Sequence, residues 1–273
     1  LSMSNPNLQQ VPARNKEFGP MIRSLFVPEE GHKWGSFDYS QQEPRMTVHY
    51  AASIGNGYEG SSELVEAYHK ASTDFHQTVA DLVGIERVQA KTIGLGLMYG
   101  MGKNKLATSL GVSKEEATVL ISKYNRKVPF VKMLSDRCMQ TANDKGVIRT
   151  KKGRKCRFDM WEPKDFGLYT AETFDNAVAK YGRENIKRAY TYKALNRLIQ
   201  GSSADQTKQA MLSCYEAGHL PILQIHDELC FNISKTNTKD TQSIKKIMES
   251  CIEFKLPFVV DVKTGGSWGT AHD

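Results

Sequence analysis

The spacing of hydrophobic and polar positions changes along the chain. Residues 1–30 show little periodicity and carry several prolines, which is typical of a loop. An apolar-rich run at 33–39 predicts a short strand. The polar-to-apolar switch after it predicts a helix capped by Ser40, with Glu43 three residues on as in a capping box. From residue 63 to residue 143 the apolar positions recur at helical spacing, so this middle part is predicted to be helical.

Breaks within the helical middle and a return to strands complete the pattern. The helices are predicted to break at Gly84, Gly100–Gly102, Gly111 and Pro129. Beyond them we predict a hairpin at 146–158 turning at Lys152–Gly153, helices at 171–181, 186–217 and 239–254, and strands at 221–233 and 257–262. Strand-bearing ends around a helical middle predict an α+β fold, in which one sheet carries an inserted helical domain.

The stretch SFDYSQQEPR, residues 36–45, is the first with candidate chemistry. Asp38 ends the predicted strand, and Glu43 lies about one turn into the next helix. A helix cap with an ordinary acidic first turn would explain both residues. A metal ligand at the strand end, facing a cleft, is the alternative interpretation of Asp38.

The stretch RVQAKTIGLGLMYG, residues 87–100, places two cations and an aromatic ring at intervals of four. Arg87, Lys91, Leu95 and Tyr99 would form one helical stripe about 18 Å long. Such cations suit a triphosphate, and the flat apolar end suits a base. An amphipathic helix with solvated cations is the plainer alternative. Glycines at 94 and 96 fit either a closely approached or bent helix, or simple packing.

The stretch LQIHDELCF, residues 223–231, sets two carboxylates in an apolar run. In a single strand Asp227 would be the polar member of an apolar face. With His226 and Asp227 in a tight turn, the acids would instead lie at a hairpin tip. A solvated acid pair is one interpretation. The other pairs Asp227 with Asp38 to hold divalent ions, for which carboxylate oxygens select magnesium or manganese.

Composition narrows these options only slightly. A net charge of +7 fits an anionic partner, although many basic proteins bind none. Five scattered cysteines without a CxxC pair indicate reduced thiols and argue against a zinc site. No apolar run approaches the roughly 18 residues that span a bilayer, so no membrane partner is expected. The opening LSMSNPNLQQ resembles neither a signal peptide nor an initiator segment, which indicates a piece of a longer protein.

Taken together, the three stretches resemble the DNA polymerase I family, also called family A. FDYSQQEPR is similar to its first acidic motif, RVQAKTIGLGLMYG to its fingers-helix motif, and IHDEL to its HDE motif. Similarity extends to PNLQQVPAR, DFH at 74–76, NRLIQGSSAD and the tail GGSWGTAHD, so it covers essentially the whole chain. Three motifs in the right order are far more specific than any one of them.

The resemblance implies a role for each matching residue. Asp38 and Asp227 would hold two magnesium ions, which manganese can replace, with help from the backbone carbonyl of Tyr39 and support from Glu228. Arg87, Lys91 and His76 would contact the phosphates of a deoxynucleoside triphosphate, and Lys91 would protonate departing pyrophosphate. The remaining expected contacts are nucleotide contacts at Gln41, Glu43 (against a ribose 2′-hydroxyl), Leu95 and Tyr99, and DNA contacts at Arg14, Asn196, Gln200 and His226.

The resemblance also implies an architecture and partners. A right-hand polymerase would have its palm at 1–46 and 187–273, as an antiparallel sheet, and all-helical fingers at 47–186. Primer–template DNA and deoxynucleotides would be the partners, together with a thumb and an exonuclease that this chain lacks. The expected location is the cytoplasm of a bacterium or of a phage-infected host, with an organellar origin left open.

Departures from the family pattern leave other functions to weigh. Leu95 replaces a usual aromatic residue, and Tyr192 a usual basic one. A nuclease would have no use for the stripe from Arg87 to Tyr99, and Glu43 as a ribose gate opposes a single-subunit RNA polymerase. A non-catalytic nucleic-acid-binding fragment would not need both aspartates together with the two cations.

Overall fold

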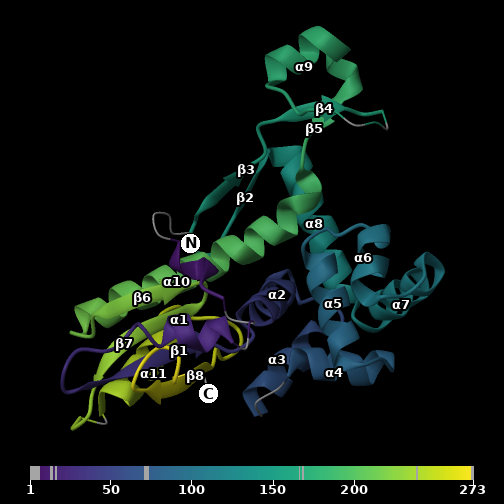
Figure 1. The fold of residues 1–273 in the computed structure, drawn as a ribbon. Coiled ribbons are helices and arrows are strands. Elements are labelled where there is room, and N and C mark those ends of the chain that lie inside the picture. The colour runs from purple at the N-terminus through teal and green to yellow at the C-terminus, as the bar shows by residue number, and fades with distance from the viewer. Residues whose placement is uncertain are drawn as a thin grey trace. The chain divides into compact units, whose positions relative to one another are not determined.

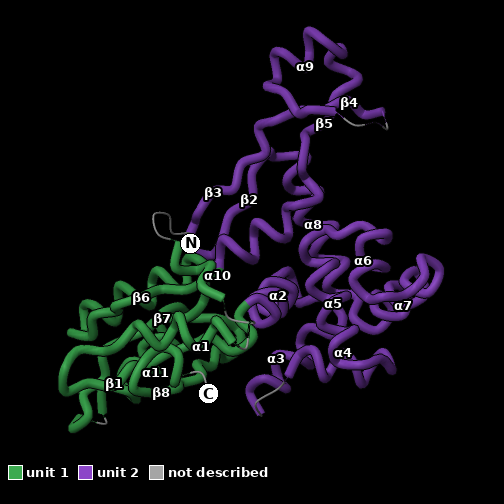
Figure 2. The backbone as a smooth tube through the Cα atoms, in the orientation of Figure 1, with its two compact units in different colours: residues 1–42, 203–273 green, residues 43–202 purple. Residues whose placement is uncertain are grey.

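The computed structural model describes residues 7–12, 15, 17–70, 74–165, 167, 169–237 and 239–271. The chain divides into two compact units, unit 1 at 1–42 and 203–273 and unit 2 at 43–202 (Figure 2). The boundaries fall at the start of helix α2, Gln42–Ser53, and inside helix α10, Ala194–Glu216. No helix among the described residues is long and apolar enough to cross a membrane.

Unit 1 is built on an antiparallel sheet of four strands in the order β6-β7-β1-β8 (Figure 1). Its elements are η1 (Leu8–Gln10), α1 (Phe18–Arg23), β1 (His32–Tyr39), β6 (Pro221–Ile225), β7 (Glu228–Ser234), α11 (Lys239–Ser250) and β8 (Val260–Gly265). Both ends of the chain therefore contribute to one sheet, as the strand-bearing ends predicted.

Alternation along β1 divides its side chains between the two faces of the sheet. On one face Trp34 stacks on Trp268, with ring centroids 6.3 Å apart, in a buried cluster. On the other face Phe37 meets Phe231 edge to face at 5.3 Å, and the hydroxyl of Tyr39 donates to the carbonyl of Met248 in α11 at 2.7 Å. Asp38 belongs to the Trp34 face and lies at the end of the strand.

Unit 2 is mostly helical. Its elements are α3 (Ser61–Lys70), α4 (Phe75–Val83), α5 (Arg87–Met98), α6 (Lys103–Leu110), α7 (Lys114–Lys127), α8 (Pro129–Lys145), β2 (Val147–Arg149), β3 (Lys155–Arg157), β4 (Trp161–Pro163), α9 (Phe174–Tyr181), η2 (Arg183–Asn185), β5 (Ile186–Arg188) and η3 (Thr191–Lys193). The predicted breaks are confirmed: Gly84 and Gly111 end α4 and α6 with φ of 71° and 68°, and Pro129 begins α8.

Two predicted helix starts are wrong. Helix α2 begins at Gln42, one residue later than a Ser40 cap requires, because Gln41 has a φ of 54° and so lies outside the right-handed helical region. Residues 186–188 are strand rather than helix, since β5 pairs with β4 and Ile186 is buried in this pairing. A tertiary contact here overrides the helical periodicity.

Three smaller boundaries also differ from the prediction. Helix α9 begins at Phe174 rather than at residue 171, because Thr173 is extended. Helix α11 ends at Ser250 rather than at 254, and the last strand lies at Val260–Gly265 rather than at 257–262. The predicted hairpins at 146–158 and 221–233 are confirmed by β2–β3 and β6–β7.

Candidate active site

A row of carboxylates crosses the sheet of unit 1 where β1 ends. The strand register places Asp38 directly opposite Glu228 on β7 and directly opposite Asp261 on β8. Residues opposite each other on neighbouring strands share a face, with Cβ atoms roughly 5 Å apart. Three acidic residues thus lie side by side, an arrangement that destabilises a sheet unless a cation offsets the repulsion.

Asp227 lies beside this row in the two-residue turn between β6 and β7. Strand β6 ends at Ile225 and β7 begins at Glu228, so His226 and Asp227 form the hairpin tip. His226 adopts a φ of 53°, and its carbonyl accepts a hydrogen bond from the Gln224 side chain at 2.5 Å. Of the two alternatives that the sequence leaves open, the turn is correct and the single strand is wrong.

The environment of Asp38 disfavours its negative charge. The protein atoms around its carboxyl group, and then the negative charges of Asp227, Glu228 and Asp261, raise the pKa of Asp38 to about 7. The residue nevertheless stays exposed to solvent at the strand end. The carboxylate is therefore accessible, and its negative charge is disfavoured by its surroundings, as expected of a group that binds a cation.

Glu228 is held differently from Asp38 and Asp227. It is 7% exposed, and its Oε1 lies 3.4 Å from the Cys230 thiol, which donates to it. Burial, followed by the charge of Glu228, raises the pKa of Cys230, so the thiol keeps its proton. Glu228 is thus oriented within the sheet, whereas the two aspartates lie nearer the solvent.

The accessible carboxylates could hold a divalent cation together with a substrate. Among the described residues, no group of three or more His, Cys, Asp and Glu side chains could hold a metal ion. Magnesium commonly takes one or two carboxylates and completes its shell with water and substrate phosphates. A pair of accessible oxygen ligands whose charges repel each other suits that mode of binding.

The predicted stripe of unit 2 lies on α5. Arg87, Lys91 and Tyr99 are exposed and Leu95 is half-buried, whereas Ala90, Ile93 and Met98 belong to the core. The predicted cationic and aromatic face is therefore presented to solvent.

The glycines of α5 serve packing. A Cβ at Gly94 would lie 3.0 Å from the Tyr124 hydroxyl, and one at Gly96 would lie 3.0 Å from Leu106 Cδ1. Both contacts would be tight, so glycine lets α7 and α6 approach this helix closely. Of the explanations that the sequence allows, the packing one agrees with these contacts.

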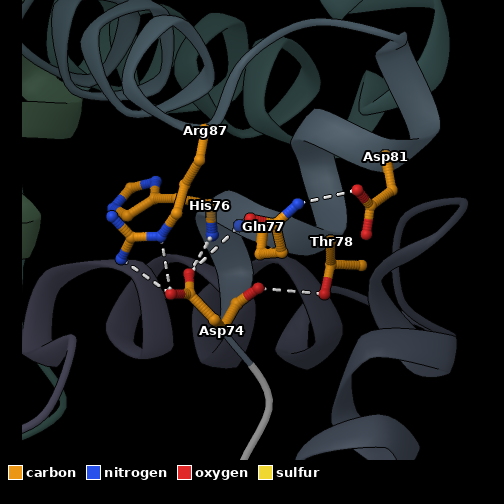
Figure 3. A network of polar contacts seen from close by, with 6 residues as sticks. All are labelled: Asp74, His76, Gln77, Thr78, Asp81 and Arg87. Atoms are coloured by element: carbon orange, nitrogen blue, oxygen red, sulfur yellow. Dashed lines mark hydrogen bonds and ion pairs between the residues drawn. The ribbon is translucent and has the colours of Figure 1, made fainter.

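Arg87, at the start of α5, is paired with Asp74, as Figure 3 shows. Its Nε donates to Asp74 Oδ2 at 2.8 Å, and its Nη2 lies 2.7 Å from the same oxygen. Asp74 caps α4, because its Oδ1 accepts from the backbone N–H groups of His76 and Gln77 at 2.9 and 3.1 Å. One carboxylate thereby joins the N-terminal ends of two helices.

His76 lies next to this pair but is buried. It is 4% exposed, and burial lowers its pKa to about 4, Asp74 acting against the shift and Lys91 and Arg87 adding to it. Its Nδ1 is buried without a hydrogen-bond partner among the described residues. The imidazole is therefore neutral near pH 7, and any contact with phosphate would be a hydrogen bond rather than an ion pair.

The other end of the stripe carries a second polar contact. The Tyr99 hydroxyl donates to Glu43 Oε2 at 2.5 Å, which joins α5 to the first turn of α2. The structure thus brings together two residues, 56 positions apart, that the sequence assigned to nucleotide binding.

The remaining predicted site residues lie in both units. His226 and Gln200 are exposed, Asn196 and Gln41 are half-buried, and the Tyr39 side chain is buried, so that only its backbone could reach a metal. Asn196 and Gln200 are four residues apart on α10 and so share a face. Arg14 lies outside the described residues.

Sequence reasoning missed two acidic residues of these sites. Asp261 is next to Asp38 only through strand register, which no motif signals. Asp74 was noted only as part of a DFH triplet, although an acid directly before a helix is a recognisable cap. Its contact with Arg87, 13 residues away, depends on the packing of α4 against α5.

Comparison with known proteins places these features in a family. The sequence profile of DNA polymerase family A matches residues 1–270. A DNA-directed DNA polymerase of Pseudomonas phage M6 is 40% identical over 98% of this chain, and DNA polymerase I of Caldicellulosiruptor bescii is 33% identical over 98%. In structure, the chain is similar over its whole length to the POL domain of Pol1 from M. smegmatis in complex with DNA primer–template and dNTP, with a TM-score of 0.80 and 30% identity.

The matches confirm the expected α+β polymerase fold class and family resemblance. The chain spans 43% of the phage protein, 30% of the C. bescii protein and 46% of the M. smegmatis chain. The match of the family profile to 270 of 273 residues decides the assignment. This chain belongs to DNA polymerase family A.

Proposed function

We propose that this chain carries the chemical centre of a template-directed DNA polymerase, which joins deoxynucleotides to a primer 3′-hydroxyl. The observation that carries the proposal is the crowded and accessible carboxylate of Asp38, opposite Glu228 and beside Asp227, in a family A chain. The name of the phage relative and the bound DNA and dNTP of the M. smegmatis structure support the same activity.

In this proposal, Asp38 and Asp227 hold two magnesium ions, or manganese in their place, aided by the Tyr39 carbonyl. Bound there, the ions would neutralise charge on the reacting phosphate and favour ionisation of the primer hydroxyl. Glu228, fixed by Cys230, supports the two aspartates. Asp261 adds negative charge on the far side of Asp38.

The α5 stripe binds the triphosphate in this proposal. Arg87 and Lys91 neutralise its phosphates, His76 offers a neutral hydrogen bond, and Lys91 protonates the departing pyrophosphate. Leu95 and Tyr99 lie along the base, with Gln41 beside the nucleotide. Glu43, held by Tyr99, leaves no room for a ribose 2′-hydroxyl.

DNA contacts and the assignment of subdomains complete the proposal. His226, Asn196, Gln200 and Arg14 contact primer or template. The palm comprises 1–46 and 187–273 and the fingers 47–186. The first boundary is near the division of the compact units at residue 42, whereas the second precedes their division at residue 202 by 16 residues. A thumb and an exonuclease would belong to a longer protein.

Primer extension with magnesium tests the proposal and separates the alternatives. We expect incorporation of deoxynucleotides and not ribonucleotides, directed by the template. The assay uses this chain and a form extended at its N-terminus by the corresponding segment of the phage relative. Ribonucleotide use would indicate an RNA polymerase, and primer shortening would indicate a nuclease. DNA binding without either reaction in both forms would indicate a non-catalytic fragment.

A further inference from the structure

Among the contacts of the described residues, those of the Arg87 guanidinium lie along one edge of the group. Asp74 occupies the Nε and Nη2 side of the group (Figure 3). Within the described part of the chain, Nη1 has no hydrogen bond. The planar group is therefore fixed in direction while one side stays available as a donor to an anion.

The carboxylate that holds Arg87 is itself fixed. Asp74 Oδ1 accepts two backbone N–H groups of α4, and the Asp74 carbonyl accepts the Thr78 hydroxyl at 3.0 Å. Oδ2 is left to point at α5. Burial alone would raise the pKa of Asp74, but the hydrogen bond from Gln77, the contacts with Arg87 and the hydrogen bond from His76 outweigh it and lower the pKa.

Arg87 needs such a partner because of its place in the helix. It is the first residue of α5, where the helix dipole disfavours a cation. Its side chain is 45% exposed, and a long exposed side chain without a partner samples many rotamers. The negative charge of Asp74 offsets the dipole, and its geometry restricts the rotamers.

We propose that Asp74 is a positioning residue for nucleotide binding, which holds Arg87 so that its free edge meets the terminal phosphates of the incoming triphosphate. The inference rests on the proposed function. Asp74 acts through Arg87 and does not itself touch the substrate, because its two oxygens already face α4 and Arg87.

Positioning and simple charge attraction predict opposite results when the Asp74 charge is removed. Coulomb attraction alone would tighten triphosphate binding, since a negative charge near Arg87 and Lys91 would be gone. Loss of positioning would weaken binding, since Arg87 would have to be ordered by the ligand. The sign of the change therefore decides between the two effects.

The variant Asp74→Ser separates positioning from folding. Serine caps a helix about as well as aspartate but is too short to reach Arg87. We expect the KM for deoxynucleotide to rise about tenfold, the effect of losing about 1.4 kcal/mol, with kcat changed less than about twofold. In an Arg87→Ala background the same change should have no further effect. Asp81→Asn, which alters an acid of the same helix bonded to Gln77, should leave KM unchanged.

A measurement without nucleotide keeps this inference distinct from the proposed function. The Nε–H resonance of Arg87 should be slow to exchange with water in the parent chain and fast in Asp74→Ser. Fast exchange in the parent, or an unchanged or lowered KM in Asp74→Ser, would overturn the inference. A parent that orders Arg87 but binds no deoxynucleoside triphosphate would refute the proposed function, and the nucleotide role of Asp74 with it.

Discussion

The carboxylate row of unit 1 and the α5 stripe of unit 2 carry charges of opposite sign. They also differ in whether their polar side chains have partners within the protein. In the row, Asp38 faces two further acids across the sheet and lies near a third, and its pKa is raised to about 7. In the stripe, each end has a partner, Asp74 for Arg87 and Glu43 for Tyr99. One region is crowded with like charge, whereas the other is paired.

This difference shows which region depends on a ligand. Crowded carboxylates gain most when a cation arrives, since it removes their mutual repulsion. Paired side chains are already oriented, so they gain specificity and lose little entropy when a substrate binds. Substitutions in the row should therefore affect the rate of the chemistry. Substitutions in the stripe should affect binding and selection, apart from those of Lys91, the proposed proton donor.

Removing the aspartate in the turn beside the row should have the largest effect. We expect Asp227→Ala to lower kcat by about 10³-fold or more, because losing one of the two proposed metal ligands would forfeit several kcal/mol of charge stabilisation. Single-turnover primer extension measures the loss. Glu228→Ala, which removes a buried group bonded to Cys230, should reduce the rate by only about tenfold. Equal losses in the two variants would show that the two carboxylates have the same role.

Because it holds a buried neutral histidine, unit 2 should become less stable as the pH falls. The pKa of His76 is about 4 in the folded chain, against 6.5 for the ordinary side chain. As the pH falls from 6.5 to 4, the unfolded chain takes up a proton that the folded chain does not, so folding loses up to about 3 kcal/mol. Above pH 6.5 the loss is absent, and below pH 4 it is complete.

Urea unfolding at a series of pH values checks this effect. The free energy of unfolding of His76→Gln should vary less between pH 6.5 and 4 than that of the parent chain. The charges of Asp74, Arg87 and Lys91 influence the pKa of His76. Asp81→Asn changes a nearby acid of the same helix and leaves these three groups in place, so it serves as a control. Parallel curves for the parent and His76→Gln would mean that His76 takes up its proton over the same pH range in the folded and unfolded chains.

Local sequence patterns predicted most elements but not the contacts between distant ones. Glycine and proline signals located the ends of α4 and α6 and the start of α8, since these residues act through their own backbone. The strand at Ile186–Arg188 was missed because its partner lies at Trp161–Pro163. Asp261 and the Asp74–Arg87 pair were missed for the same reason, since register and helix packing join residues that no local motif relates.

Selection against ribonucleotides should depend more on Glu43 than on Tyr99, whose hydroxyl donates a hydrogen bond to it. We expect Glu43→Ala to reduce the preference for deoxynucleotides over ribonucleotides by roughly 10-fold to 100-fold, because one group of atoms in a pocket contributes about 1–3 kcal/mol to selectivity. Ratios of kcat/KM for the two nucleotides measure it. Tyr99→Phe keeps the carboxylate and removes only its hydrogen bond, so its effect should be smaller. An unchanged preference in Glu43→Ala would rule out this role.

The half-buried Leu95 should give the smallest effect, within the stripe itself. It lies one helical turn from both Lys91 and Tyr99, where a flat ring would cover more of a nucleotide than a branched aliphatic chain does. We expect Leu95→Phe to raise the single-turnover rate at subsaturating nucleotide a few-fold, about 0.5–1.5 kcal/mol of added aromatic contact. Leu95→Met keeps a similar volume without a ring and should match the parent. If Leu95→Phe and the parent incorporate nucleotides at equal rates, the side chain at position 95 does not limit the reaction. The proposed contribution of the stripe to nucleotide binding would then come from its paired ends, Arg87 and Tyr99.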